Sequence, residues 1–222
     1  MSIDNPLKRF SSDADADKFE QHIKPHIQDQ RVIDVGCVQH SLDQVGSEGW
    51  LHGNIVGVAK QTVGIDIVED AIDELRTRGY RVEKRDVQNP APNAYQNYDV
   101  VIMGELIEHL IDFKTALSNA HAWLKQDGKL ILTTPNALSA YWLLLRGLNR
   151  DFVNPEHTCW FDSTTLEQLL SRCQFKLTGV AYVRMSRLQA LARPTTAVGY
   201  IIERFLPPRI AHRNMVAVAK PV

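Results

Sequence analysis

The sequence lacks both a cysteine pattern and an excess of charge of either sign. Only three of the 222 residues are cysteines, Cys37, Cys159 and Cys173, and no two of them form a C-x-x-C pair. Their number and spacing speak against a disulfide framework and a structural zinc site, so we expect no metal. The 25 Lys and Arg residues are balanced by 26 Asp and Glu residues, without a basic run. Because a nucleic-acid surface usually needs a basic excess, we expect no nucleic-acid partner.

Long apolar runs are also missing. The opening residues 1–19 have no apolar core of the signal-peptide kind, and no run approaches the roughly 20 apolar residues that cross a bilayer. We therefore expect a cytoplasmic protein without a transmembrane segment. No repeat or Pro/Gly/Ser-rich linker divides the chain, and its length suits a core of full size. Residues 1–222 are accordingly predicted to form one domain.

Short apolar runs alternate with segments of helical period along most of the chain. This alternation is typical of a mostly parallel sheet that is covered by helices. Strands are predicted at 31–35, 62–67, 80–84, 99–103, 129–134, 175–183 and 215–220. Gly128 is predicted to end the helix that begins near residue 113. Thr164 and Glu167 are predicted to cap a later helix reciprocally.

Small and acidic residues stand where four of these strands end. Ligands of an α/β sheet bind beyond the carboxyl ends of its strands, near the point where the strand order reverses. A glycine there lets the backbone approach a ligand, and a carboxylate can accept hydrogen bonds from ribose hydroxyls. The candidates, in chain order, are Asp34, Gly36, Cys37, Asp66, Ile67, Asp86, Val87, Gly104 and Glu105. For Asp34 a role in fixing loop amides is an equal alternative, and Cys37 fits a small core residue as well.

These segments resemble the motifs of the class I S-adenosylmethionine-dependent methyltransferases. The similar segments are VIDVGC (32–37), GIDI (64–67), RDV (85–87) and DVVIMGELIEHL (99–110), and the resemblance spans roughly residues 28–183. It implies an α/β, Rossmann-like three-layer sandwich, with a mostly parallel seven-stranded sheet whose last strand is antiparallel. It also implies S-adenosylmethionine as cofactor. The Gly36 turn would then contact the methionine part, Asp66 the ribose, Ile67 an adenine face and Asp86 the adenine amino group.

The first motif departs from the family pattern at two positions. That family usually continues the motif as G-x-G-x-G, whereas Val38 and His40 stand at the second and third glycines. Side chains at these positions either hold the turn at negative φ or push the cofactor slightly away. We expect that Val38→Gly does not abolish cofactor binding.

Three ionisable residues are candidates for chemistry on the methyl acceptor. Glu108 and His109 follow the fourth predicted strand, and His157 lies in a Pro-Glu-His segment just before a predicted helix. An imidazole titrates near neutrality, so His157 can take a hydroxyl proton as the methyl group arrives. The structural alternatives are a hydrogen bond from His157 to a loop carbonyl, and packing or helix-end roles for Glu108 and His109.

These residues favour O-methylation of a small or lipid-linked molecule, such as a sugar or a quinone-like phenol. N- or C-methylation of a metabolite is an alternative, as is a non-catalytic protein that binds the cofactor or a partner. Apolar helical insertions are predicted at about 137–150 and 186–210. They are candidates for a substrate lid, a peripheral membrane contact or a dimer face, with core packing as the alternative. We expect a monomer or a homodimer.

Overall fold

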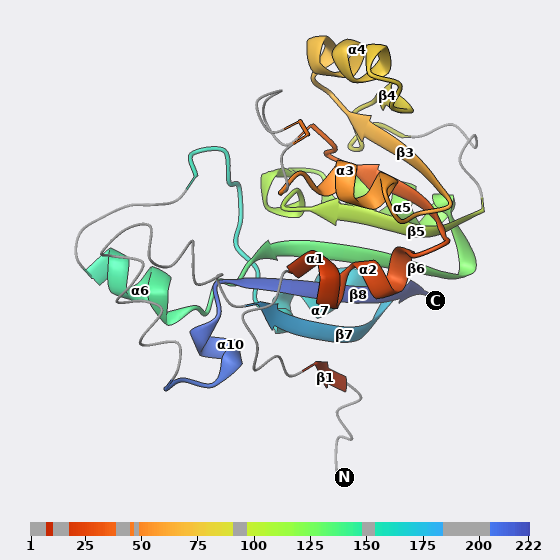
Figure 1. The fold of residues 1–222 in the computed structure, drawn as a ribbon. Helices are drawn as coiled ribbons and strands as arrows, with labels where there is room; N and C mark the ends of the chain where they lie inside the picture. The colour runs from red at the N-terminus through yellow and green to blue at the C-terminus, as the bar shows by residue number, and fades with distance from the viewer. Residues whose placement is uncertain are drawn as a thin grey trace.

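One mixed sheet runs through the protein in a computed structural model that describes residues 8–10, 18–38, 45–46, 49–90, 97–147, 154–183 and 205–222. The strands are β1 Lys8–Phe10, β2 Arg31–Val35, β3 Gln61–Asp66, β4 Val82–Lys84, β5 Tyr98–Gly104, β6 Leu124–Pro135, β7 Phe175–Val183 and β8 Asn214–Pro221. They lie in the order β1-β7-β8-β6-β5-β2-β3-β4 (Figure 1).

The strand order reverses beside β2. From β2 the chain continues outward to β3 and β4, and it then returns to β5 on the other side of β2. β2 pairs in parallel with both β3 and β5, and β5 pairs in parallel with β6. β8 runs antiparallel between β6 and β7. The carboxyl ends of β2 and β5 therefore flank the crevice in which such sheets bind ligands.

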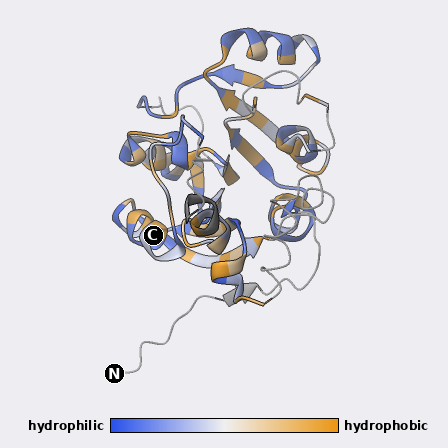
Figure 2. Ribbon diagram, turned by 90° about the vertical axis from the view of Figure 1, so that its left-hand side faces the viewer, coloured by the Kyte–Doolittle hydropathy of each residue, from blue (hydrophilic) through white to orange (hydrophobic). Residues whose placement is uncertain are grey.

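Helices cover both faces of the sheet. They are α1 Lys18–His22, α2 Lys24–Ile27, α3 Leu51–Val56, α4 Glu69–Thr77, η3 Ile107–His109, α5 Phe113–Trp123, α6 Ala140–Gly147, α7 Ser163–Arg172 and α10 Pro208–Ala211. Buried side chains of α1, α2 and α3 pack with Val32 and Ile102, whereas those of α5 and α7 pack with Ile33 and Val101. Adjacent strand residues face opposite layers because side chains alternate along a strand. Hydrophobic and hydrophilic residues accordingly alternate along both the strands and the helices (Figure 2).

The predicted seven-stranded sheet with its antiparallel last strand is confirmed, and the short β1 adds an edge strand beside β7 that the sequence did not indicate. The prediction for Gly128 is wrong, because α5 ends at Trp123 and β6 begins at the next residue. Tyr98 pairs with Leu124 but Val100 pairs with Lys129, so residues 125–128 bulge out of the ladder. Gly128 belongs to that bulge, where an added Cβ would lie 2.9 Å from a Leu124 methyl carbon.

A capping box was predicted for α7 with Thr164 and Glu167, but other residues form it. Asp162 is the N-cap, its side chain accepts the Thr164 N–H at 2.8 Å, and the Thr165 hydroxyl accepts the Asp162 N–H at 3.1 Å. The helix begins at Ser163, so the reciprocal pair falls two residues earlier than Thr164 and Glu167. A capping box is present, shifted along the chain.

The two predicted insertions are described in part. The first contains α6, and the second is described only from residue 205, with α10 beginning at Pro208. The remainder of the second insertion lies outside the described residues. Among the described helices, none is both long and apolar enough to pass through a bilayer.

Candidate functional site

A cavity of about 500 Å³ lies at the carboxyl ends of β2, β3, β4 and β5. Seven of the nine residues predicted to contact the cofactor line it, namely Gly36, Asp66, Ile67, Asp86, Val87, Gly104 and Glu105. His109 lines it as well. The strand-end pattern in the sequence thus converges on one space in the fold.

The turn after β2 brings bare backbone to the cavity. Gly36 has φ +82°, a conformation that side chains disfavour, and its N–H donates to the Ile65 carbonyl at 2.8 Å. A Cβ at this position would lie 3.4 Å from a Leu106 methyl carbon. Both the backbone conformation and the neighbouring side chain therefore favour glycine.

Asp66 holds this turn as well as lining the cavity. One carboxylate oxygen accepts the Val38 N–H at 2.9 Å, and the other accepts the N–H groups of Ile67 at 2.7 Å and Val68 at 3.1 Å. A carboxylate offers about four acceptor positions, so three backbone bonds leave one for a ligand. Ile67 next to it is 63% exposed and presents an uncovered apolar surface to the cavity.

The turn after β4 forms a second wall. The Asp86 carboxylate accepts the Gln88 N–H at 2.8 Å and so closes a local turn. The Gln88 side-chain oxygen accepts the N–H groups of Ile111 at 2.8 Å and Asp112 at 2.9 Å, which ties this wall to the segment after η3. Sequence reasoning missed Gln88, although its place two residues after Asp86 at a strand end was a usable signal.

Asp34 and Cys37 are buried beneath the turn and do not line the cavity. An Asp34 carboxylate oxygen lies 2.9 Å from His52 Nδ1, and both side chains are at most 1% exposed. Burial, followed by the charges of Asp34 and Asp66, raises the pKa of the Cys37 thiol. An added Cβ on Gly64 would lie 2.7 Å from His52 and 2.8 Å from the Cys37 sulfur. These residues support the first turn from below, so a packing and positioning role fits them better than cofactor contact.

Val38 turns away from the cavity into the core. Its side chain is fully buried in a cluster with Trp50, Ala71, Ile72 and Leu75. It is not among the described non-glycine residues with positive φ, in keeping with the expected negative φ. The departure from the glycine pattern therefore fills the core and not the ligand space. His40 lies outside the described residues.

Glu105 joins the cavity to a charged group at the end of β5. Its backbone has φ +48°, and its N–H donates to the carbonyl of Thr133 at 2.9 Å and to the hydroxyl of Thr133 at 3.0 Å. Its carboxylate pairs with Lys18 of α1 and accepts the Thr133 hydroxyl at 2.9 Å. Burial alone would raise the pKa of this carboxyl, but Lys18 and the hydrogen bonds outweigh burial and lower it. Lys18 lies too far away in the chain for sequence reasoning to have joined it to this site.

Glu108 lies behind the cavity in η3 and is 1% exposed. One carboxylate oxygen, Oε2, accepts the Thr134 hydroxyl at 2.9 Å. Within the described part of the chain no hydrogen-bond partner reaches the other oxygen, Oε1. Burial, and then the negative charge of Glu105, raises the pKa of Glu108 to about 8. The pKa values of the two neighbouring carboxyl groups are therefore shifted in opposite directions.

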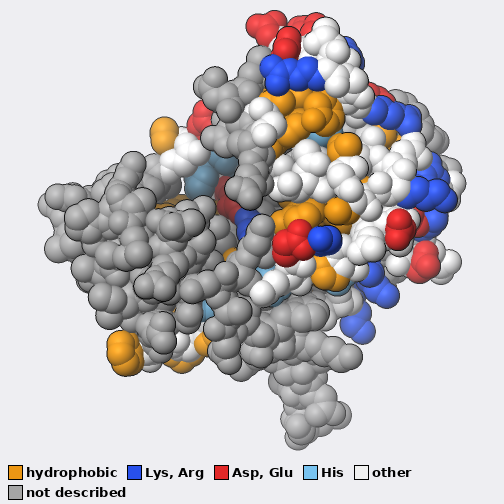
Figure 3. Space-filling view, viewed as in Figure 1, with side chains coloured by type: hydrophobic (Ala, Val, Ile, Leu, Met, Phe, Trp, Pro, Cys, Tyr) orange, Lys and Arg blue, Asp and Glu red, His pale blue; other side chains and the backbone are white. Residues whose placement is uncertain are grey.

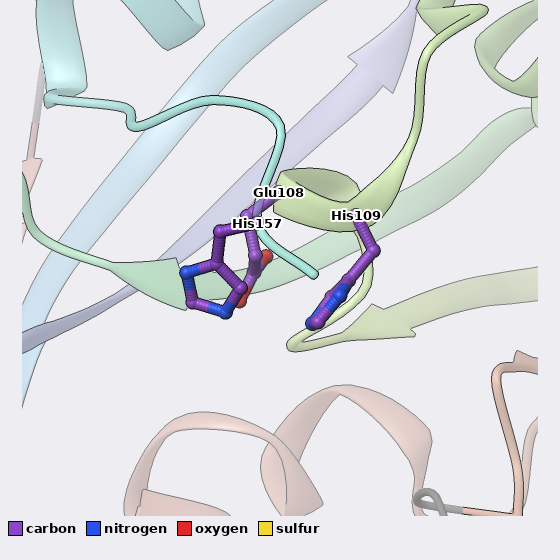
Figure 4. A group of neighbouring side chains, drawn as sticks. All are labelled: Glu108, His109 and His157. Atoms are coloured by element: carbon purple, nitrogen blue, oxygen red, sulfur yellow. The ribbon is translucent and has the colours of Figure 1, made fainter. Parts of the chain in front are cut away.

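The ring of His157 lies next to the ring of His109 and close to the Glu108 carboxylate (Figure 4). Their ring centroids are 4.7 Å apart, and His109 Nδ1 lies 4.0 Å from a carboxylate oxygen of Glu156. The His157 loop is fixed to η3, because the Thr158 N–H donates to the Glu108 carbonyl at 2.8 Å. In Figure 3 a small area left of the middle of the face shows histidine, acidic and basic side chains next to one another. The fold thus brings Glu108, His109 and His157 together from segments about 50 residues apart.

Aromatic rings continue from His157 toward α6, and neither Trp160 nor Trp142 lines the cavity. His157 and Trp160 have ring centroids 6.3 Å apart, and Trp160 and Trp142 of α6 are 5.3 Å apart. The Arg213 guanidinium lies 3.3 Å from the ring centroid of Tyr141. Sequence reasoning missed these rings, because α6 and the loop before α7 meet only in the folded chain.

A family model described as a methyltransferase domain matches residues 7–180. A probable S-adenosylmethionine-dependent methyltransferase of Mycolicibacterium smegmatis is 29% identical over 150 residues, covering 66% of this chain and 52% of that protein. A ubiquinone biosynthesis O-methyltransferase of Haemophilus ducreyi is 31% identical over 158 residues, covering 62% of this chain and 65% of that protein. The chain therefore spans about half to two thirds of the length of these curated relatives.

Solved structures share the fold. A SAM-dependent methyltransferase of Archaeoglobus fulgidus aligns with a TM-score of 0.61 at 20% identity, covering 91% of both chains. The magnesium protoporphyrin IX methyltransferase of Synechocystis, solved with bound SAH, aligns with a TM-score of 0.58 at 13% identity, covering 88% of this chain and 75% of that one. At these identities the likeness speaks for the fold alone.

Proposed function

We propose that this protein methylates a hydroxyl group of a small or lipid-linked acceptor. The proposal starts from its family, because the chain belongs to the class I S-adenosylmethionine-dependent methyltransferases. The observation that carries this proposal is the group of Glu108, His109 and His157, which adjoins the cofactor cavity. A hydroxyl is a weak nucleophile until its proton is withdrawn, so ionisable groups beside the cavity suit it as acceptor.

The residues around the cavity fit S-adenosylmethionine. Asp66 keeps one acceptor position and would take a ribose hydroxyl, while the exposed Ile67 side chain would lie against the adenine ring. Asp86 would receive the adenine amino group, and the bare backbone of Gly36 would lie against the methionine part.

The protein's own part is mainly alignment and exclusion of water. When bound, the cofactor supplies both an electrophilic methyl group and its leaving group. Leu106 and Leu110 line the cavity with apolar surface, which would keep water from competing with a bound acceptor. The anchored loop of His157 and Thr158 would hold the acceptor hydroxyl beside the cavity.

The rings next to His157 support an acceptor with a flat or apolar body. Trp160 and Trp142 continue from His157, so an acceptor that reaches the cavity past them would lie against aromatic surface. The relative from Haemophilus ducreyi is named as an O-methyltransferase, which agrees with a hydroxyl acceptor. A quinone-like phenol fits these features better than a sugar does.

Transfer of a labelled methyl group tests the proposal. The purified protein is incubated with methyl-labelled S-adenosylmethionine and a metabolite extract, and the products are identified by mass. We expect a methyl ether whose formation requires His157. His121→Ala is the matched control, because His121 of α5 packs against the buried Phe175 and does not belong to the group of Glu108, His109 and His157. Labelled amines or carbon-methylated products would contradict O-methylation, and cofactor binding without any product would favour a non-catalytic role.

A further inference from the structure

We propose that Glu108, His109 and His157 form a binding site for one divalent transition-metal cation beside the cofactor cavity. Each of the three side chains offers one ligand atom, and these atoms all lie within 4.8 Å of one another. Figure 4 shows the two imidazoles and the carboxylate facing the same space, with Glu108 and His109 on η3 and His157 on the opposite loop. The metal site itself does not depend on the proposed function. Only the catalytic role of the metal rests on the proposed O-methylation.

The ligand set suits zinc, manganese or iron. Two imidazole nitrogens and one carboxylate oxygen are a common ligand set for these cations. Ligand atoms about 2.1 Å from one metal are at most about 4.2 Å apart, so small side-chain rotations close the observed arrangement. The expectation that the protein holds no metal rested on cysteine spacing, which does not bear on a site of this kind.

The buried carboxylate of Glu108 is an independent sign of a missing partner. Its Oε2 is held by Thr134, while Oε1 is buried and, when Glu108 is ionised, has no hydrogen-bond donor within the described residues; only the protonated acid can hydrogen-bond to Glu105. An unpaired carboxylate oxygen at 1% exposure is costly unless a positive charge or a donor reaches it. A cation bound between Glu108 and the two histidines satisfies this oxygen.

The surroundings of the three side chains resemble the support that metal sites need. The Thr158 hydroxyl donates to the Leu110 carbonyl at 2.6 Å, and the Thr158 N–H donates to the Glu108 carbonyl at 2.8 Å, so the two ligand-bearing segments are fixed to each other. Glu156 lies 4.0 Å from His109 Nδ1 and can orient that ring, as carboxylates beside metal-bound histidines do. Three protein ligands leave further coordination positions free, and His109 and Glu156 both line the cavity.

In the proposed reaction the cation would bind the acceptor oxygen and make its proton more acidic. The acceptor O–H bond breaks and the proton leaves to solvent. An oxygen electron pair then forms the bond to the methyl carbon, while the electron pair of the sulfur–methyl bond stays on sulfur. The products are a methyl ether, the demethylated cofactor and one proton, so atoms and charges balance.

Direct binding of metal alone tests the site without any turnover. The metal-stripped protein is titrated with Zn²⁺, Mn²⁺ or Co²⁺, followed by calorimetry and by the visible spectrum of Co²⁺. We expect calorimetry to give one cation per chain, and we expect the visible spectrum of bound Co²⁺ to be that of a cation with nitrogen and oxygen ligands. His109→Ala and Glu108→Gln should each weaken binding by more than about 100-fold, and Glu156→Gln by about 10-fold.

His121→Ala is the matched control, because it removes an imidazole outside the three-residue group. Circular dichroism and S-adenosylmethionine binding verify that each variant is folded. Failure of the wild type to bind any of the three cations at 0.1 mM, roughly the weak end of useful sites, overturns the proposal. Equal cation affinity in the wild type and in both ligand variants overturns it as well.

Removal of the cation then separates the site from the proposed function. If chelation lowers methyl-ether formation at least about tenfold and the added cation restores it, the catalytic role is supported. Full turnover by metal-free protein overturns that role and leaves His157 as a general base. A cation that binds while no hydroxyl is methylated contradicts the proposed function and supports the site.

Discussion

Two parts of the site, the proposed cofactor end with Asp66 and Asp86 and the proposed acceptor end with Glu108, His109 and His157, differ in how their polar atoms are satisfied. At the cofactor end Asp66 accepts three backbone N–H groups and Asp86 accepts one, so the carboxylates are built into the turns that carry them. Beside the proposed acceptor group, Glu105, itself a predicted cofactor contact, holds a positive φ, and Glu108 buries an oxygen that accepts no hydrogen bond from a described residue. The carboxylates of the first end are satisfied by their own turns, whereas the second end buries a carboxylate oxygen for which the described residues offer no donor.

We infer from this difference that the proposed acceptor end is less stable than the proposed cofactor end because of its role in the chemistry. Strained backbone and unpaired buried groups cost free energy and persist where the surrounding structure enforces them. The two Thr133 acceptors of the Glu105 N–H and the anchored Thr158 loop supply that enforcement. Substitutions at the acceptor end should therefore affect turnover, and substitutions at the cofactor end should affect cofactor affinity.

The largest effect is expected for His157→Ala. Turnover should fall by roughly 100- to 10,000-fold, the usual range when a positioned group that handles a proton is lost. Cofactor affinity should stay within about twofold, because His157 does not line the cavity. Steady-state rates and calorimetry on the same preparation measure the two quantities. A parallel loss of cofactor affinity would join the two ends and contradict the separation proposed here.

Asp66→Ala should act at the opposite end. We expect cofactor binding to weaken by about 1 to 3 kcal/mol, because the variant loses a charged acceptor and releases three N–H groups of the turn. Asp70→Ala, an exposed carboxylate in the first turn of α4, is the control and should bind normally. Isothermal titration with S-adenosylmethionine measures both. Unchanged affinity in Asp66→Ala would remove Asp66 from the cofactor site.

Gly36→Ala is expected to weaken cofactor binding about tenfold. The added methyl group meets Leu106 at 3.4 Å, and a non-glycine residue at φ +82° costs about 1 kcal/mol. Gly79→Ala carries the same backbone strain at φ +88°, with no atom within 4 Å of the new methyl group, after the end of α4. Both variants should lose similar thermal stability, but only Gly36→Ala should lose affinity. Equal affinities in the two variants would show that the Gly36 turn does not approach the ligand.

The same comparison explains how much the sequence could predict. The cofactor end is carried by contiguous motifs at strand ends, so Gly36, Asp66 and Asp86 could be placed from chain position alone. The acceptor end was predicted only as separate candidates, because its partners come from distant segments. Lys18 reaches Glu105 across 87 positions, and no local pattern encodes such a contact. Asp162 and Thr164 are both suitable N-cap residues in the sequence. Which of them caps α7 depends on where the helix begins, and the structure places its first residue at Ser163.

The smallest effect on the ligand is expected for Val38→Gly, at the position where the first motif departs from the family pattern. The Val38 side chain is fully buried against Trp50 and Leu75 and does not line the cavity, so its removal should leave cofactor affinity within about twofold. The Val38 N–H that Asp66 accepts is retained in glycine.

The stability of Val38→Gly should fall by about 2 to 4 kcal/mol, because a buried valine side chain is lost and the unfolded chain gains freedom. Thermal denaturation and cofactor titration together measure this, with Val56→Gly as control, since that valine is 42% exposed in α3 and its loss removes little buried surface. A large loss of affinity in folded Val38→Gly would mean that the valine sets the shape of the cavity from behind, and the glycine pattern of the family would then not apply to this turn.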